Sequence, residues 1–127
     1  MTPFGARLRE LRARRGLTLT RMAADLNISA AYLSALEHGR RGSPTPGLVQ
    51  QICGYFNLIW DEVEYLKRLA TLSRPRVTLD TAGLPAETTR LANELAEAIR
   101  DLPEEDAREL RLALATLRGK GPGHPPS

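Results

Sequence analysis

Residues 17–41 read LTLTRMAADLNISAAYLSALEHGRR, and this stretch decides the fold. It contains two short runs with helical apolar spacing, each preceded by a residue that caps helices, Thr18 for the first run and Ser29 for the second. Asn27 falls between the runs, where the turn requires a left-handed backbone that Asn tolerates better than other non-glycine residues. Two short helices joined by so few residues, with arginines directly after them, predict a helix-turn-helix.

The second of these helices has an inner and an outer face. At 100° per residue, Leu33 and Leu36 define the inner face, which packs on the other helices. The opposite face carries small or polar side chains, which suit a helix pressed into the major groove of DNA. Arg40 and Arg41 follow at once, where they can reach phosphates. The predicted DNA-binding residues are Thr18, Thr20, Arg21, Ser29, Ala30, Ala31, Tyr32, Ser34, His38, Arg40 and Arg41.

Helical apolar spacing continues on both sides of the motif. We expect one helix before it, over residues 3–15, and two after it, one opened by Pro46 and one running from near Trp60 through Leu72. Trp60 is expected to anchor the core. These helices complete an all-α DNA-binding domain of five helices over residues 1–72.

The chain changes character after this domain. Residues 73–84 contain Pro and Gly around a short apolar stretch, which predicts an extended connector that could form a short strand. Residues 85–118 are expected to form a hairpin of two helices, and residues 119–127, GKGPGHPPS, are expected to be disordered. The apolar stripe of the hairpin consists of Leu91, Leu95, Ile99, Leu102, Leu110, Leu114 and Leu117.

Charge is distributed unevenly along the chain. The 127 residues have a formal net charge of +3, and 16 of the 18 basic residues are Arg. Residues 1–43 hold eight Arg and three acidic residues, a net charge of +5, whereas residues 80–127 carry −3. A basic front and an acidic rear indicate a segment that binds a polyanion, joined to a segment with another role.

Composition argues against several other classes of protein. No apolar run approaches the roughly 20 residues of a membrane-spanning helix, and the N-terminus lacks the apolar region of a signal peptide. A single Cys, Cys53, and two His residues give no basis for a disulfide or a metal site. No nucleophile–base pair or Gly-rich phosphate loop is present, so we expect no enzyme, no cofactor and no metal. The expected protein is cytoplasmic and makes no contact with a membrane.

Several short motifs mark the first half of the chain. They are LRELR at residues 8–12, GLT at residues 16–18, MA at residues 22–23, and SAAYLS at residues 29–34 followed by LEHGR at residues 36–40. Over residues 4–72 the chain therefore resembles the XRE family, whose DNA-binding domain has five helices of the phage Cro/repressor type. The resemblance implies a transcriptional regulator, and it implies an ion pair between Arg12 and Glu37 that ties the first helix to the end of the third.

Two positions depart from the pattern of that family. Many members carry Gln early in the second helix and again in the third, where this chain has Leu19 and the pair Ala30–Ala31. We therefore expect little direct hydrogen bonding to bases. Methyl contacts, the hydroxyl groups of the motif and the shape of the DNA should carry more of the sequence preference.

The hairpin leaves three alternatives open. Its leucines could fold back on the first domain, pair with a second copy of the chain, or bind a different protein. A single helix-turn-helix reads only about five base pairs. We therefore favour self-association through residues 85–118, because a dimer would span about one turn of DNA. The leading hypothesis is a repressor that binds a pseudo-palindromic operator as a homodimer. The alternative is an antitoxin-like or adaptor protein, and any small-molecule effector is unknown.

Overall fold

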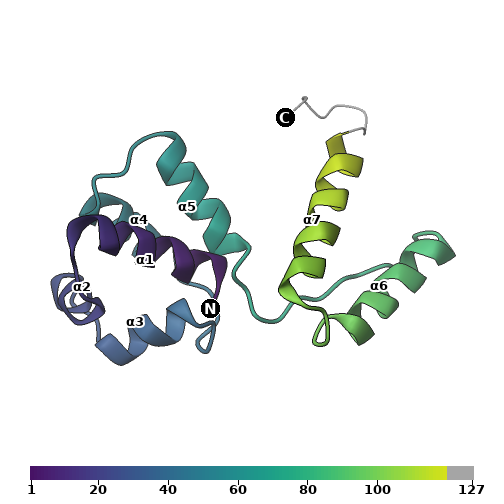
Figure 1. The fold of residues 1–127 in the computed structure, drawn as a ribbon, viewed down its shortest axis with the longest axis horizontal. Helices are drawn as coiled ribbons and strands as arrows, with labels where there is room; N and C mark the ends of the chain where they lie inside the picture. The colour runs from purple at the N-terminus through teal and green to yellow at the C-terminus, as the bar shows by residue number, and fades with distance from the viewer. Residues whose placement is uncertain (120–127) are drawn as a thin grey trace. The chain divides into compact units, whose positions relative to one another are not determined.

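The computed structural model describes residues 1–119, and its regular structure within that range is entirely helical (Figure 1). The seven helices are α1 (Pro3–Arg15), α2 (Leu19–Asp25), α3 (Ala30–Glu37), α4 (Pro46–Tyr55), α5 (Asp61–Thr71), α6 (Ala86–Ala98) and α7 (Glu104–Gly119). The all-α prediction is confirmed, and residues 73–84 form no strand. The chain divides into two compact units, an N-terminal unit (Met1–Thr78) and a C-terminal unit that begins at Leu79.

Helices α1 to α5 share one apolar core in the N-terminal unit. Helix α1 packs against both α3 and α5, while α2 packs on α3 and α4 packs on α5. Each of the five helices contributes buried side chains, because each carries apolar residues at helical spacing on one side. The buried apolar residues are Phe4, Leu8, Leu11, Met22, Ala23, Leu26, Leu33, Leu36, Leu48, Val49, Ile52, Cys53, Phe56, Leu66 and Ala70.

Hydroxyl side chains start four of these helices. The Oγ atoms of Thr2, Thr18, Ser29 and Thr45 each accept a hydrogen bond from the backbone N–H three residues later, at 3.0 to 3.2 Å. Each bond satisfies a donor that the first turn of a helix leaves free. At the other end of α1, Gly16 adopts a left-handed conformation with φ of 63° and stops the helix. The caps at Thr18 and Ser29 confirm those expected from the sequence.

The start of α1 lies unusually close to the end of α3. The backbone N–H and the hydroxyl of Thr2 both donate to the carbonyl oxygen of Glu37, at 2.9 and 3.1 Å. A Cβ placed on Gly5 would lie 2.7 Å from the Cα of Glu37. The absence of a side chain at Gly5 therefore allows α1 and α3 to approach each other at this point.

Trp60 is not a core residue, and the sequence-based expectation for it is wrong. Its side chain is 84% exposed. Its backbone has a φ of 46°, a value that residues other than glycine rarely adopt, at the turn through which the chain enters α5. Leu58 and Val63 pack partly against the core from the two sides of this turn, and Leu66 is fully buried. These three neighbours, and not Trp60, pack against the core at this point.

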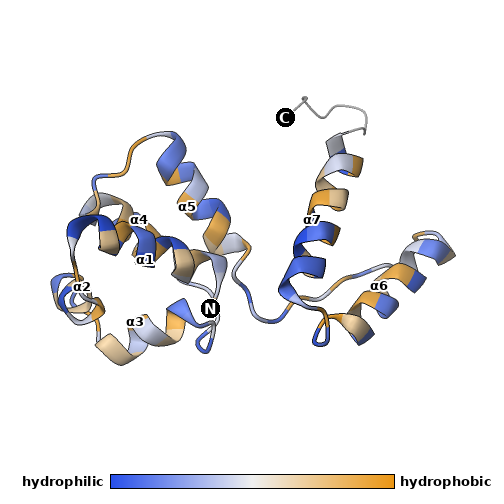
Figure 2. Ribbon diagram, viewed as in Figure 1, coloured by the Kyte–Doolittle hydropathy of each residue, from blue (hydrophilic) through white to orange (hydrophobic). Residues whose placement is uncertain are grey.

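The C-terminal unit contains the two helices expected after the connector. Residues before α6 fold onto its first turn, since the hydroxyl of Thr89 donates to that of Thr81 at 2.9 Å. However, neither α6 nor α7 has a buried residue, and Leu102 in the connection is only partly covered. Figure 2 shows hydrophobic and hydrophilic residues alternating along both helices. The leucine stripes thus remain open to solvent in the single chain.

Two further expectations concern the end of the chain and membranes. Gly119, expected to begin a disordered tail, is the last residue of α7. The remainder of that tail, residues 120–127, lies outside the described residues. Over residues 1–119, every helix is too short or too polar to cross a lipid bilayer.

Candidate nucleic-acid interface

Helices α2 and α3, with the turn between them, form the helix-turn-helix. Asn27 has a φ of 59°, which confirms the left-handed turn predicted at this position. Met22 and Ala23 of α2 are buried, and so is Leu33 of α3, so the two helices meet through small and flexible side chains. Ile28 in the turn is partly buried against the same core. This packing holds α3 at one edge of the unit and leaves the face of α3 that points away from the core free.

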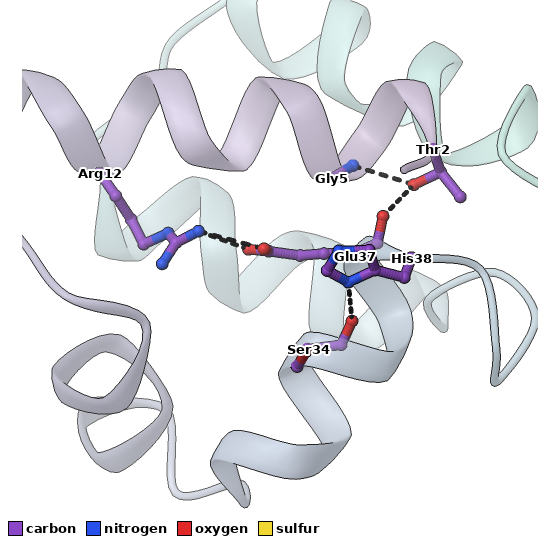
Figure 3. Close-up of polar contacts among 6 residues, drawn as sticks. All are labelled: Thr2, Gly5, Arg12, Ser34, Glu37 and His38. Carbon is purple, nitrogen blue, oxygen red and sulfur yellow. Dashed lines mark hydrogen bonds and ion pairs between the residues drawn. The ribbon is translucent and has the colours of Figure 1, made fainter.

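A buried ion pair fixes the far end of α3. The Nη2 atom of Arg12 in α1 lies 3.1 Å from both carboxylate oxygens of Glu37 (Figure 3). Only the contact to Oε1 meets the geometry of a hydrogen bond. Among residues 1–119, Nε of Arg12 and Oε2 of Glu37 therefore have no hydrogen-bond partner. The structure thus confirms the Arg12–Glu37 ion pair implied by the family resemblance. The pair makes one hydrogen bond and is not bidentate.

The surroundings of Glu37 affect its protonation. Burial raises the pKa of the Glu37 carboxyl above its ordinary value, and the positive charge of Arg12 opposes this shift without cancelling it. Burial dominates because the side chain of Glu37 is 1% exposed, so its charged form has lost almost all contact with water. The pair therefore holds α1 and α3 together at an electrostatic cost.

The predicted reading face of α3 is open at some positions and partly covered at others. Ala31 and His38 are exposed and Ser34 is half-buried. Ala30 and Tyr32 are half-buried, and both pack against the hydrophobic core. The exposed positions on the outer face of α3 are thus Ala31 and His38.

Charged and hydroxyl groups surround this face. Arg40 and Arg41, which follow α3, are both exposed, as are Thr18 and Thr20 at the start of α2 and Ser29 at the start of α3. The hydroxyls of Thr18 and Ser29 accept backbone hydrogen bonds as helix caps, but each keeps its own hydrogen to donate to a phosphate. All eleven predicted residues thus lie on the helix-turn-helix or directly behind it.

His38 has a structural role as well as an exposed position. Its Nδ1 donates a hydrogen bond of 2.9 Å to the carbonyl oxygen of Ser34, one turn earlier in the chain (Figure 3). The same carbonyl also accepts the backbone N–H of His38 at 3.1 Å, so the ring adds a second hydrogen bond at the end of α3. Only the other ring nitrogen, Nε2, remains for a contact outside the protein.

A model of the helix-turn-helix domain family matches residues 3–66, half of the chain. The chain belongs to the helix-turn-helix domain family. Two curated relatives come from Bacillus subtilis. HTH-type transcriptional regulator RghRB is 36% identical over 63 residues, 50% of this chain and 45% of the relative. HTH-type transcriptional repressor RghR is 34% identical over 65 residues, 51% of this chain and 48% of the relative.

The family match is confined to the helix-turn-helix domain, residues 3–66. The chain spans about half the length of the curated relatives it matches. No solved structure matches the chain. The family match and the relatives together confirm the resemblance to XRE-type regulators, and the family match does not include the C-terminal unit.

One contact in the helix-turn-helix domain was missed by sequence reasoning. The Asp25 carboxylate receives a hydrogen bond of 2.6 Å from the Tyr55 hydroxyl, and it lies 3.2 Å from Nε of Arg21. The hydrogen bond from Tyr55, with help from Arg21, lowers the pKa of Asp25 below its ordinary value. The spacing of Arg21 and Asp25, four residues apart in a helix, could have signalled the pair. Arg21 therefore reaches the interface already partnered by an acidic residue.

The arginines of α1 also turn out to have different roles. Arg7 contacts Glu10 at 2.9 Å and lies over the ring of Tyr65, while Arg15 donates to the Tyr55 carbonyl at 2.9 Å. These two residues tie α1 to α5 and α4. Arg9 and Arg14 are exposed and give α1 a basic solvent-facing side.

Proposed function

We propose that this protein is a transcriptional repressor that inserts α3 into the major groove of a pseudo-palindromic operator and acts as a homodimer. The observation that carries the proposal is the outer face of α3. It presents the small side chains of Ala31 and Ser34, and Arg40 and Arg41 follow directly behind it. Support for a role in transcription comes from the names of the two relatives, one of them a repressor.

Two kinds of contact contribute differently to this binding. Arg40 and Arg41 lie beyond the end of α3, where the DNA backbone would pass, so they contribute affinity that does not depend on sequence. Ala31 and Ser34 occupy the accessible face, where a methyl can contact thymine and a hydroxyl can bond to base edges. Because no Arg, Gln or Asn lies on this face of α3, the shape of the operator carries a larger share of the preference.

A homodimer follows from the size of the motif. One recognition helix covers about five base pairs, which is too few to select a site in a genome. Two copies related by a two-fold axis would place two α3 helices about one turn of DNA apart. In this proposal the domain over residues 1–72 reads DNA, and residues 85–118 hold the two copies together.

The first experiment is selection of bound sequences from random DNA by the full chain. We expect an inverted repeat whose half-sites are centred about 10 base pairs apart. A single unrepeated site would argue against the dimer. If the recovered DNA showed no sequence preference at any salt concentration, this would argue against sequence-specific regulation altogether.

Variants of the same chain then separate the two kinds of contact. Arg40→Ala should weaken binding to the selected operator and to unrelated DNA by a similar factor, whereas Ala31→Ser and Ser34→Ala should change which sequences are preferred. Arg14→Ala is the matched control, because Arg14 is an exposed arginine outside the predicted interface. If Arg40→Ala altered only the choice of site, the assignment of Arg40 to phosphate would be wrong.

A second candidate function rests on the open stripes of α6 and α7. Apolar helix faces with no buried residue could equally receive a different protein, as in an antitoxin-like or adaptor protein that tethers a partner to DNA. A dimer that forms from the purified chain alone would favour the repressor. A chain that stays monomeric would favour the adaptor.

A further inference from the structure

The C-terminal unit has helices but no core. Helix α6 has 13 residues and α7 has 16, and neither contains a buried residue. Isolated helices of about this length are marginal in water, because their stability in proteins comes from burying an apolar face. Something other than the unit itself must cover these faces if the two helices are to persist.

Each helix concentrates its large apolar residues on one face. Leu91, Leu95 and Ile99 of α6 are spaced four residues apart and so lie along one side. In α7, Leu110, Leu114 and Leu117 likewise share one side. Each of these six side chains is at least 36% exposed, so each helix presents a row of apolar side chains to solvent.

Leu112 provides an internal reference for this face. It is two residues from both Leu110 and Leu114, which places it about 200° around the helix from them. In the single chain Leu112 is 53% exposed and Leu114 is 56% exposed. The two leucines thus have nearly the same exposed fraction in one copy, and they lie on different faces of α7.

We propose that the stripes of α6 and α7 are covered by the same stripes of a second copy, and that the two helices become stable only when the copies pair. The resulting interface is a four-helix arrangement in which α7 of one copy runs antiparallel to α7 of the other. This inference deepens the homodimer of the proposed function, on which it rests. It adds which face pairs, which leucine lies outside the interface and how folding depends on association.

Charge along α7 favours a second copy in this orientation. The first turns are mainly acidic, with Glu104, Glu105, Asp106 and Glu109 against a single base, Arg108, which lies 3.6 Å from Glu104, whereas Arg111 and Arg118 lie further along. An antiparallel pair that sets Leu110 opposite Leu114 of the second copy also brings Glu104 beside Arg118 of that copy. Two such attractive pairs form by symmetry, against one like-charged pair at the central Arg111. A parallel pair would instead bring the acidic turns of both copies together.

The decisive test compares Leu114→Asp with Leu112→Asp in the full chain, by sedimentation equilibrium and far-ultraviolet circular dichroism without DNA. Leu114→Asp should raise the dimer dissociation constant by about 100-fold or more, because it buries a charge in the seam. In the monomer it should also lose helical signal, since α6 and α7 hold more than a third of the residues in the seven helices. Leu112→Asp should leave both quantities close to those of the original chain.

Three outcomes would overturn the proposal. Equal effects of the two substitutions would show that the pairing face is not the one carrying Leu114. Undiminished helical signal in a monomeric Leu114→Asp chain would show that the helices do not depend on pairing. A chain that is monomeric at about 100 μM would show that no second copy covers the stripes. In each case binding of DNA is measured separately, so the DNA-binding proposal can stand while this inference fails.

A charge exchange tests the antiparallel orientation. Glu104→Arg and Arg118→Glu should each weaken the dimer by about tenfold, because each converts two attractive pairs into repulsive ones. The double substitution should restore the original affinity in an antiparallel dimer. If its effect equals the sum of the two single effects, the residues do not meet across the interface and the orientation is wrong.

Discussion

At the residue scale, Glu37 combines three constraints at the end of α3. Its carboxylate pairs with Arg12, its carbonyl oxygen accepts two hydrogen bonds from Thr2, and its backbone lies against Gly5 (Figure 3). All three partners belong to the start of the chain or to α1. The orientation of the recognition helix therefore depends on a few contacts that never touch DNA.

The ion pair should be strongly coupled. We expect Arg12→Ala and Glu37→Ala each to lower the free energy of unfolding by about 3 kcal/mol, because each leaves a buried charge without a partner. The double substitution should cost clearly less than the sum of the two single costs. Denaturant unfolding of the four chains measures this, and additive costs would mean that the pair contributes little coupling.

The raised pKa of Glu37 predicts a pH dependence. Because burial raises this pKa in the folded state, the carboxyl contributes stability that is fully present below its ordinary value of 4.5 and is lost as pH rises through the folded pKa. Glu37→Gln removes this titration. The free energy of unfolding of the variant minus that of the original chain should therefore increase as pH rises above about 4.5. A difference that stays constant from pH 4 to pH 8 would contradict the raised pKa.

Gly5 offers a test of the close approach between α1 and α3. Gly5→Ala should destabilise the protein by about 2 kcal/mol, because the new Cβ would collide with the backbone of Glu37. Gly54→Ala is the matched control, since Gly54 also lies in a helix but has open space around its Cα. The control should stabilise the protein by about 0.5–1 kcal/mol through helix propensity. Equal thermal shifts of the same sign for both variants would refute the contact.

At the element scale, the turn between α2 and α3 sets how the recognition helix is presented. Asn27 holds its left-handed conformation without glycine, and a hydroxyl residue caps the start of each of the two helices. These are local features, and the sequence pattern predicted each of them. The exposure of Trp60 was not predictable in this way, because it depends on the backbone direction with which α5 enters the core.

The turn yields a prediction about Asn27. Asn27→Gly should leave stability nearly unchanged, because glycine adopts a φ of 59° without strain. Asn27→Val should cost about 1–2 kcal/mol, because a β-branched side chain strongly disfavours the left-handed region. Thermal unfolding of both variants measures the difference. Equal melting temperatures would show that this conformation is not required for the turn.

At the scale of the whole molecule, a basic N-terminal unit is joined to an acidic C-terminal segment. The proposed dimer makes the two half-sites act together, because binding of the first copy raises the local concentration of the second. Leu114→Asp should therefore lower affinity for the full operator by about 100-fold and leave affinity for a single half-site unchanged. Leu112→Asp should change neither affinity. Loss of half-site binding in Leu114→Asp would show damage to the reading domain instead.

The sequence by itself determined the helices, their caps, the left-handed turn and the basic character of the motif. These properties depend on residues within a few positions of one another, so local spacing and capping chemistry are sufficient to predict them. Only the tertiary structure decided the Gly5 approach to Glu37, the Asp25–Tyr55 contact and the outward side chain of Trp60. Each joins or separates groups through the relative placement of helices, which local patterns do not specify. The same reason explains the C-terminal helices, whose amphipathic pattern was readable but whose open faces became evident only from the folded chain.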